Sequence, residues 1–454
     1  MNNTPDWIQS AFIYHLYPLG LTAAPHDNHY EAPTEYRLDK LYAWLDHLQW
    51  LGVNTLFLGP ILQSSQHGYD TIDYFHIDKR LGDNHSFKAF SQEVHRRGMR
   101  LILDAVFNHS GRDFWAFQDL QQKGQQSPYK DWYEGVRFDQ ASPVGDAFNY
   151  ETWAGYHSLP KFNLANPAVR EHLFQAVRFW INEWGIDGLR LDAADHVRLD
   201  FWQELRQITT SLQPDFWLMG EVVHGEYQEW ANNEHLHSVT NYEAYKGLYS
   251  SLNDANFFEI AHTLQRQFGE SGLYRDLMLY NFVDNHDVNR VASQLKFKGH
   301  LYPLYALLFT MPGIPSLYYG SEWGLEGKRS EFSDQALRPA LNLESLIHNA
   351  PIANLPDTIR QLSDIRFGNS ALQIGSYRQA FISPTQFAFW RETEDQKVLV
   401  AINAASESAT ISGIQIPDYQ MVRQIPGKDF SFTIQNNEIQ LQIPPQWFSI
   451  LIFD

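Results

Sequence analysis

Short apolar runs alternate with longer amphipathic segments along most of the chain, and this alternation limits the possible folds more than any other feature. Apolar runs at residues 12–18, 53–58 and 100–106 are separated by amphipathic stretches at 41–51 and 87–97. A rhythm of this kind favours parallel strands that are covered by helices. Further strands are predicted at 188–192, 216–221, 238–241, 277–283 and 316–319, and further helices at 167–184, 200–211, 256–268, 301–311 and about 357–367. Eight strands in this rhythm predict an α/β fold of the (β/α)8 TIM-barrel type.

Two segments depart from the rhythm. Residues 111–162 are rich in glycine, proline and aromatic residues, and this stretch is too long for an ordinary loop. After residue 370, short apolar segments at 373–377, 387–391, 397–403, 439–443 and 449–453 are joined by turn residues, which predicts antiparallel strands. The predicted domains are 1–110 and 163–370 for the two parts of the barrel, 111–162 for an insertion after the third strand, and 371–454 for a C-terminal β-sandwich.

The charge and the cysteine content narrow the possible functions. With 34 basic and 53 acidic residues the net charge is −19, which disfavours nucleic acid and anionic membranes as partners and suits a neutral substrate. The chain has no cysteine, which excludes disulfides, thiolate metal sites and cysteine nucleophiles. The first residues lack a basic start followed by an apolar stretch, and no apolar run is long enough to cross a membrane, so we expect a cytoplasmic protein.

Four predicted strands end in polar residues. Their segments are Asp104–His109, Gly188–His196, Met219–Val223 and Phe282–Asp287. A single acid at a strand end is often only a helix cap, but the carboxyl ends of barrel strands meet at one face, where TIM barrels carry their chemistry. The four segments together therefore predict one active site.

Alternation along the second of these strands, at 188–192, assigns its side chains. Arg190 and Asp192 share one face of the strand, and Leu189 and Leu191 share the other. A buried structural ion pair is the alternative interpretation, but a guanidinium next to a carboxylate also favours the ionised form that a nucleophile requires. Glu221 follows Gly220 at an apolar strand end, which suits a general acid. Two such carboxyls predict glycoside hydrolysis with retention if they lie close together.

These four segments, in this order, resemble the signature regions of the α-amylase family of glycoside hydrolases. The resemblance spans about residues 10–370, with 111–162 resembling the family's domain B. It implies Asp192 as the nucleophile, Glu221 as the acid/base and Asp287 as a third carboxylate that holds sugar hydroxyls. It also implies substrate-binding roles for Tyr69, Asp70, His109, Arg190 and His286, and supporting roles for Asp104 and Asn108.

Some residues depart from the pattern of calcium-dependent α-amylases. Lys161 stands where those enzymes carry an aspartate that helps to hold calcium, so we expect no calcium or other metal cofactor there. The segment around Lys161 resembles the neopullulanase and cyclomaltodextrinase branch. That branch has a β domain before the barrel, whereas the first strand here begins near Phe12, so a monomer and a homodimer are both open. Asp195 replaces a lysine of true α-amylases, and Arg338 either reaches the sugar or is solvated.

The resemblance implies hydrolysis of α-1,4-glucosidic bonds in maltooligosaccharides, cyclodextrins or related α-glucans by double displacement, with transglycosylation as a further outcome. The alternatives are an exo-acting α-glucosidase for α-1,4 or α-1,6 bonds, or a 4-α-glucanotransferase. A non-catalytic relative is a remote alternative, because such a chain is expected to have lost carboxylates that are present here.

Overall fold

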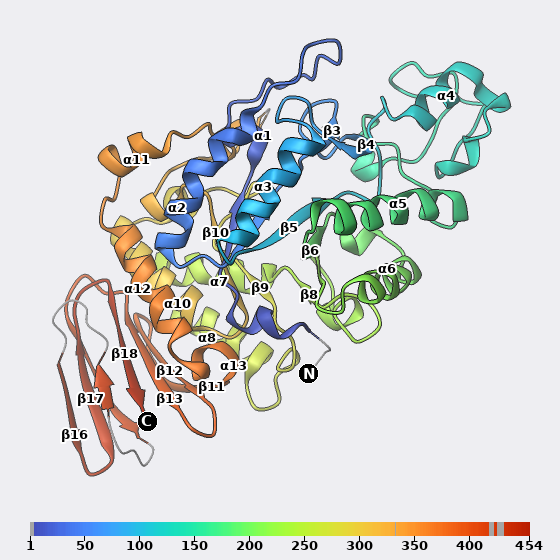
Figure 1. Ribbon diagram of the computed structural model, residues 1–454. Helices are drawn as coiled ribbons and strands as arrows, with labels where there is room; N and C mark the ends of the chain where they lie inside the picture. Colours follow the sequence, from blue (N-terminus) through green and yellow to red (C-terminus); the bar gives the residue numbers. More distant parts are fainter. Residues whose placement is uncertain (1–3, 332, 417–421, 425–430) are drawn as a thin grey trace.

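The computed structural model describes residues 4–331, 333–416, 422–424 and 431–454. Eight parallel strands form one sheet in the order β8-β7-β6-β5-β2-β1-β10-β9 (Figure 1). They are β1 (Ile13–Leu16), β2 (Thr55–Leu58), β5 (Arg100–Ala105), β6 (Gly188–Leu191), β7 (Trp217–Gly220), β8 (Ser238–Val239), β9 (Tyr280–Asn281) and β10 (Ile314–Tyr318). The two edges meet where Thr240 pairs in parallel with Tyr280, and the Asn241 amide donates to the Tyr280 carbonyl at 2.9 Å. This contact closes the sheet, which confirms the predicted barrel.

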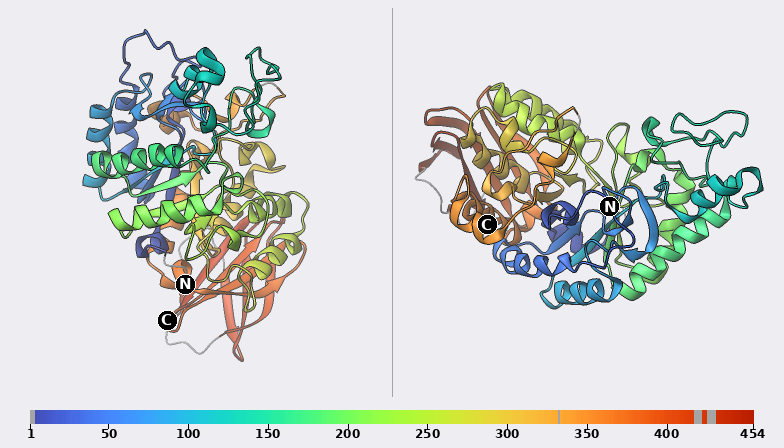
Figure 2. Two further views of the ribbon diagram at one scale, coloured as in Figure 1. Left: turned by 90° about the vertical axis from the view of Figure 1, so that its right-hand side faces the viewer. Right: turned by 90° about the horizontal axis from the view of Figure 1, so that it is seen from above.

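Helices surround the barrel (Figures 1 and 2). The principal ones are α2 (Tyr42–Leu51), α3 (Asn84–Arg96), α5 (Pro167–Phe179), α6 (Leu199–Leu212), α7 (Tyr242–Asn253), α8 (Phe257–Phe268), α10 (Leu301–Thr310) and α12 (Leu355–Phe367). In α3, the Asp83 side chain caps the Ser86 amide, and Phe87, Phe90 and Val94 are buried at helical spacing. Helix α5 continues into a π-helical turn, η6 (Trp180–Trp184), that ends at Gly185 with a φ of 68°.

Helix α7 was not predicted. Gly247 and Ser251 lie on its buried face and weaken the apolar pattern, and its best local signal is Asn241, whose side chain accepts from the Ala244 amide. The hairpin β3 (Leu62–Ser64) and β4 (Thr71–Ile77), which lies between β2 and α3, was not predicted either. Both elements supply side chains or loops to the site described below.

Residues 111–162, called domain B from here on, project from the barrel and contain one longer helix, α4 (Trp115–Lys123). Turns η3 (Gly124–Gln126), η4 (Lys130–Trp132) and η5 (Trp153–Gly155) complete it. Its chain is held by isolated antiparallel bridges, among them Arg137 with Asn149 and Thr152 with Pro160. Figures 1 and 2 place it at the end of the molecule opposite the C-terminal strands.

The C-terminal strands form two antiparallel sheets, as predicted. The five-stranded sheet has the order β11-β12-β13-β18-β15 and the three-stranded sheet the order β14-β17-β16. Their bounds are β11 (Ser376–Ile382), β12 (Gln386–Glu392), β13 (Lys397–Asn403), β14 (Ala409–Gln415), β15 (Val422–Gln424), β16 (Ser431–Gln435), β17 (Glu438–Ile443) and β18 (Trp447–Phe453). The strand predicted at 373–377 is wrong at its start, because α13 (Ser370–Ile374) occupies that position and Gln373 bonds back to the Arg366 carbonyl at 3.0 Å.

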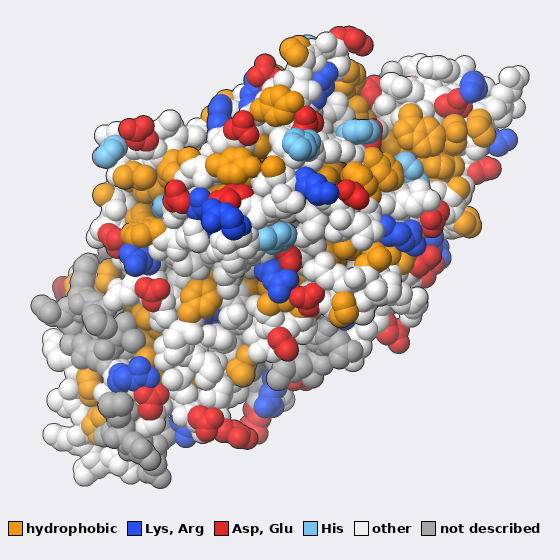
Figure 3. Space-filling view, viewed as in Figure 1, with side chains coloured by type: hydrophobic (Ala, Val, Ile, Leu, Met, Phe, Trp, Pro, Cys, Tyr) orange, Lys and Arg blue, Asp and Glu red, His pale blue; other side chains and the backbone are white. Residues whose placement is uncertain are grey.

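Basic and acidic side chains are intermingled on the face shown in Figure 3. Within the described residues, no helix combines the length and the apolar character that crossing a membrane would require.

Candidate active site

Arg190 lies at the centre of the site and joins three acids from three neighbouring strands. Its Nη1 lies 2.8 Å from Asp104 Oδ1 and 2.9 Å from Asp192 Oδ1, and its Nη2 lies 2.8 Å from Glu221 Oε2. Strand β6, which carries Arg190, lies between β5 and β7, whose ends carry Asp104 and Glu221. The two predicted reaction carboxyls therefore share one planar guanidinium.

The local backbone brings Asp192 and Glu221 together. The alternation predicted for β6 is present: Leu189 and Leu191 pack in the core while the Asp192 amide donates to the Ala105 carbonyl at 3.0 Å. Behind Glu221, a Cβ on Gly220 would lie 2.5 Å from Leu236 Cδ1 and 2.9 Å from Ala194 Cβ, so only glycine fits.

A second group of side chains holds Asp287. Tyr69 Oη donates to Asp104 Oδ2 at 2.9 Å and lies 2.5 Å from His286 Nε2. The same imidazole nitrogen is 2.8 Å from Asp287 Oδ2, and Arg338 Nη2 is 3.2 Å from Asp287 Oδ1. The Tyr69 and His286 rings are also stacked, with centroids 5.2 Å apart. Asp287 is thus linked through Tyr69 to the cluster around Arg190.

His109 occupies the other side of Tyr69. Its Nε2 donates to the Tyr69 carbonyl at 3.1 Å, and its Nδ1 accepts from Asn108 Nδ2 at 3.3 Å. Asp70 is buried, with the Gly68 amide donating to its Oδ1 at 3.1 Å. The structure therefore places Tyr69, Asp70, His109 and His286 on one contiguous surface beside the carboxylates.

Lys161 and Asn108 lie where domain B meets the barrel. The backbones of Lys161 and His109 form an antiparallel bridge, and Lys161 Nζ lies 2.9 Å from Glu134 Oε2. Asn108 is buried, and its Oδ1 has no hydrogen-bond partner within the part of the chain that the structure describes. Over the same residues, no group of three or more His, Asp or Glu side chains is arranged to hold a metal ion.

The structure adds two residues to those chosen from the sequence, Tyr242 and Tyr17. Tyr242, on the unpredicted helix α7, donates from its Oη to Glu221 Oε1 at 3.3 Å. Tyr17 follows β1, and the centre of its ring lies 4.8 Å from the guanidinium of Arg338.

The structure also places Arg338 and Asp195, which the sequence had singled out. The Arg338 side chain is only 11% exposed, which excludes the solvated alternative. Asp195 lies close to the site, and its ion-pair partner is His196 at 3.8 Å.

Burial and the neighbouring charges set the protonation of the site. Burial raises the pKa of Asp192 well above its usual value, and Glu221, Asp104 and Asp287 act in the same direction against Arg190. The sequence-based expectation that Arg190 alone would keep Asp192 ionised is therefore incomplete. For Asp287, burial acts to raise the pKa, but His286, Arg338 and Arg190 outweigh it and hold the pKa well below its usual value. Burial lowers the pKa of His109 to about 3, so its ring is neutral.

A profile of the "Alpha amylase, catalytic domain" family matches residues 38–350, which include all four carboxyl-bearing segments. The chain belongs to the α-amylase family. A cyclomaltodextrinase of a Bacillus species is 32% identical over 420 residues, which are 88% of this chain and 73% of that protein. Neopullulanase 2 of Thermoactinomyces vulgaris is 34% identical over 450 residues, which are 91% of this chain and 72% of that protein. These relatives confirm the predicted branch of the family.

Several solved structures match this chain over almost its whole length, and one of them serves as an example. It is the ligand-free cyclic α-maltosyl-(1→6)-maltose hydrolase of Arthrobacter globiformis, with a TM-score of 0.83, 27% identity and coverage of 99% of this chain and 100% of that chain.

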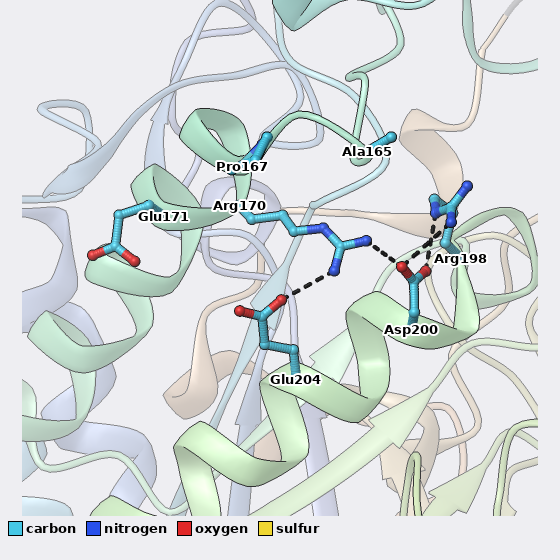
Figure 4. A pocket seen from close by; sticks show the side chains of 7 residues that line it. All are labelled: Ala165, Pro167, Arg170, Glu171, Arg198, Asp200 and Glu204. Carbon is cyan, nitrogen blue, oxygen red and sulfur yellow. Dashed lines mark hydrogen bonds and ion pairs between the residues drawn. The ribbon is translucent and has the colours of Figure 1, made fainter.

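A separate surface cavity of about 520 Å³ lies between α5 and α6, away from the catalytic segments of this α-amylase family member (Figure 4). The charges that line it are paired: Arg170 contacts Asp200 at 2.6 Å and Glu204 at 3.0 Å, Arg198 contacts Asp200 at 2.9 Å, and Glu171 lies 3.6 Å from Arg178 outside the cavity. This pairing leaves the cavity with no free charge for a ligand.

Proposed function

We propose that this chain is a retaining glycoside hydrolase that cleaves α-1,4-glucosidic bonds in maltooligosaccharides and cyclodextrins, with transglycosylation to sugar acceptors as a second outcome. The observation that carries the proposal is that one guanidinium, Arg190, bridges Asp192 and Glu221 at 2.9 and 2.8 Å. Retention by double displacement requires two carboxyls about 5–5.5 Å apart, whereas inversion requires a wider gap. Sharing a single planar group favours the narrow arrangement.

In the first step, Glu221 gives a proton to the leaving glycosidic oxygen while Asp192 attacks the anomeric carbon and forms a glycosyl-enzyme. In the second step, Glu221 takes a proton from water, or from a sugar hydroxyl, as that oxygen displaces Asp192. Asp287 stays ionised, because its pKa is held low, and accepts hydrogen bonds from hydroxyls of the reacting sugar. The neutral ring of His109 binds the same sugar.

Asp192 acts as the nucleophile in its ionised form. Burial and the neighbouring acids raise its pKa well above the usual value, whereas Arg190, at 2.9 Å, acts against them and favours the carboxylate. Glu221 carries the proton in the first step. Tyr242 Oη lies 3.3 Å from its Oε1, and Arg190 contacts its other oxygen, Oε2.

The stereochemistry of the product tests the proposal. Proton NMR during hydrolysis of maltotriose is expected to show the α-anomer first, followed by mutarotation. A β-anomer in the first spectra would reject double displacement. Product profiles from maltoheptaose, pullulan and γ-cyclodextrin measure the bond and chain-length preference. Glucose as the sole product, with rings left intact, would instead support the exo-acting α-glucosidase.

We further propose that no calcium ion is needed between domain B and the barrel. The Lys161 ammonium lies at this junction and pairs with Glu134 at 2.9 Å, so a cation of the chain itself already balances an acid there. Activity and melting temperature are therefore expected to be unchanged after dialysis against EDTA. A loss of activity that added calcium restores would contradict this proposal. The predicted cytoplasmic location, and the choice between monomer and homodimer, stay predictions for fractionation and light scattering.

A further inference from the structure

Two aromatic rings of domain B continue the surface of the site outward from His109. The Trp153 ring centre lies 5.9 Å from that of His109, and the Tyr156 ring is stacked on Trp153 at 6.0 Å, with 20° between their planes. Trp153 is half-buried, whereas the Tyr156 side chain is 58% exposed. The mechanism proposed above uses neither ring.

The turn that carries the rings is firmly held. The Trp153 amide donates to the Leu159 carbonyl at 3.0 Å, the Tyr156 amide donates to the Trp153 carbonyl at 2.9 Å, and the Leu159 amide returns a bond to the Tyr156 carbonyl at 2.9 Å. Two successive residues between the rings adopt left-handed backbone angles, Ala154 with a φ of 48° and Gly155 with a φ of 84°. Alanine is disfavoured in this conformation, so the surrounding bonds hold a strained turn in place.

The strained turn holds the exposed Tyr156 ring next to the site, and strained backbone of this kind is concentrated at active sites and ligand-binding segments. Pyranose sugars carry apolar faces of C–H groups, and the face of a tyrosine or tryptophan ring is a surface on which such a face can pack. The rings are uncharged, as an α-glucan is. Trp153 adjoins His109, a residue at the predicted sugar site. A glucan bound at that site would therefore extend from His109 toward the two rings.

We propose that Trp153 and Tyr156 form a binding platform for a further glucosyl unit of the α-glucan, beyond the unit that His109 contacts. This inference rests on the proposed function, since it assigns a second sugar position to the same site. In this platform, the Tyr156 ring contacts the sugar. The Trp153 ring also contacts the sugar and supports the Tyr156 ring. Substrates long enough to reach the platform are then bound more tightly than short ones.

Calorimetric titration of maltoheptaose tests the platform directly, in the Asp192→Asn background so that the sugar is not consumed. Tyr156→Ala is expected to weaken binding about tenfold, the loss of roughly one ring contact. Trp153→Phe keeps an aromatic ring and breaks no hydrogen bond of the described structure, since Trp153 Nε1 has no partner there. It is expected to weaken binding about threefold or less. Phe297→Ala removes a ring that is equally exposed, at 58%, and contacts His300 outside the site, so it serves as the matched control.

An unchanged dissociation constant in Tyr156→Ala, or an equal loss in Phe297→Ala, would overturn the platform. Binding does not depend on turnover, so the two proposals fail separately. If the wild-type chain binds maltoheptaose through Tyr156 but hydrolyses no α-glucan, the proposed function fails. If it hydrolyses maltoheptaose normally and Tyr156→Ala binds as tightly as its parent, only the platform fails.

Discussion

Replacing Asp192 with asparagine is expected to lower kcat on maltotriose by about 10⁴- to 10⁶-fold, the range seen when a covalent nucleophile is removed. The amide cannot form the glycosyl ester, yet it has the shape of the carboxyl and still accepts a hydrogen bond from Arg190, which lies 2.9 Å from Asp192 Oδ1. Turnover is measured by the release of reducing sugar, with the wild-type protein as reference.

The same substitution is expected to leave the melting temperature equal to that of the wild type or higher. The pKa of Asp192 is raised in the folded state by burial and by the neighbouring acids. The stability linked to such a carboxyl is fully present below its unfolded pKa and is lost as the pH rises toward and through its folded pKa. At pH 7, above the unfolded pKa, Asp192 therefore disfavours folding, and a neutral amide removes this penalty.

Asp200→Asn is the matched control for Asp192→Asn. Asp200 opens helix α6 a few residues after Asp192, is about half exposed and pairs with Arg170 and Arg198 (Figure 4). The kcat of Asp200→Asn is expected to stay within about twofold of the wild-type value, because an exposed ion pair contributes little free energy. If Asp192→Asn kept more than about one hundredth of the wild-type kcat, the assignment of the nucleophile would be wrong.

The sequence predicted the barrel well because each of its strands is an apolar run followed by turn residues, so local pattern and global fold agree. It failed where a local pattern is weak. Gly247 and Ser251 on its buried face weaken the apolar pattern of helix α7, so neither that helix nor Tyr242, which contacts Glu221, was predicted. The strands β8 and β9 are two residues long, shorter than the runs that predicted them, since the chain leaves the sheet once the barrel closes.

Side-chain partners depend on the meeting of distant segments, which a single strand pattern cannot specify. Alternation in β6 predicted that Arg190 faces the site beside Asp192, but not that it also binds Asp104 and Glu221. The burial of Arg338 follows from its contacts with Tyr17 and Asp287, which come from opposite ends of the barrel sequence. The pKa of Asp192 depends on charged groups from four segments of the chain, so it could not be predicted from Arg190 alone.

Removing the guanidinium is expected to have the largest effect on stability of any single change in the site. Arg190→Met fills much of the same volume but leaves Asp104, Asp192 and Glu221 without their common cation. Breaking a buried ion pair by removing one partner destabilises a protein by about 3–5 kcal/mol, and Arg190 is 3% exposed. Urea unfolding at pH 7.5 is therefore expected to show a free energy of unfolding lower by about this amount.

The loss in Arg190→Met is expected to shrink as the pH falls. Arg190 lowers the pKa of Asp104 and of Asp192, so its removal raises both folded pKa values further above those of the unfolded chain. Raised carboxyls bind protons in the folded state that the unfolded state has released, and stability then rises as the pH is lowered toward the unfolded pKa of about 4. The difference from wild type should thus be larger at pH 7.5 than at pH 5.

Two further variants separate the charge of Arg190 from its geometry. Arg190→Lys restores a cation but offers a single ammonium in place of two terminal nitrogens that bridge Asp192 and Glu221, so it should recover part of the stability and little of the activity. Arg198→Met removes a guanidinium that is 55% exposed and is expected to change stability by less than about 1 kcal/mol. Equal stability of Arg190→Met and wild type at pH 7.5 would mean that the buried acids do not depend on Arg190 to balance their charge, and the shared-guanidinium basis of the mechanism would fall with it.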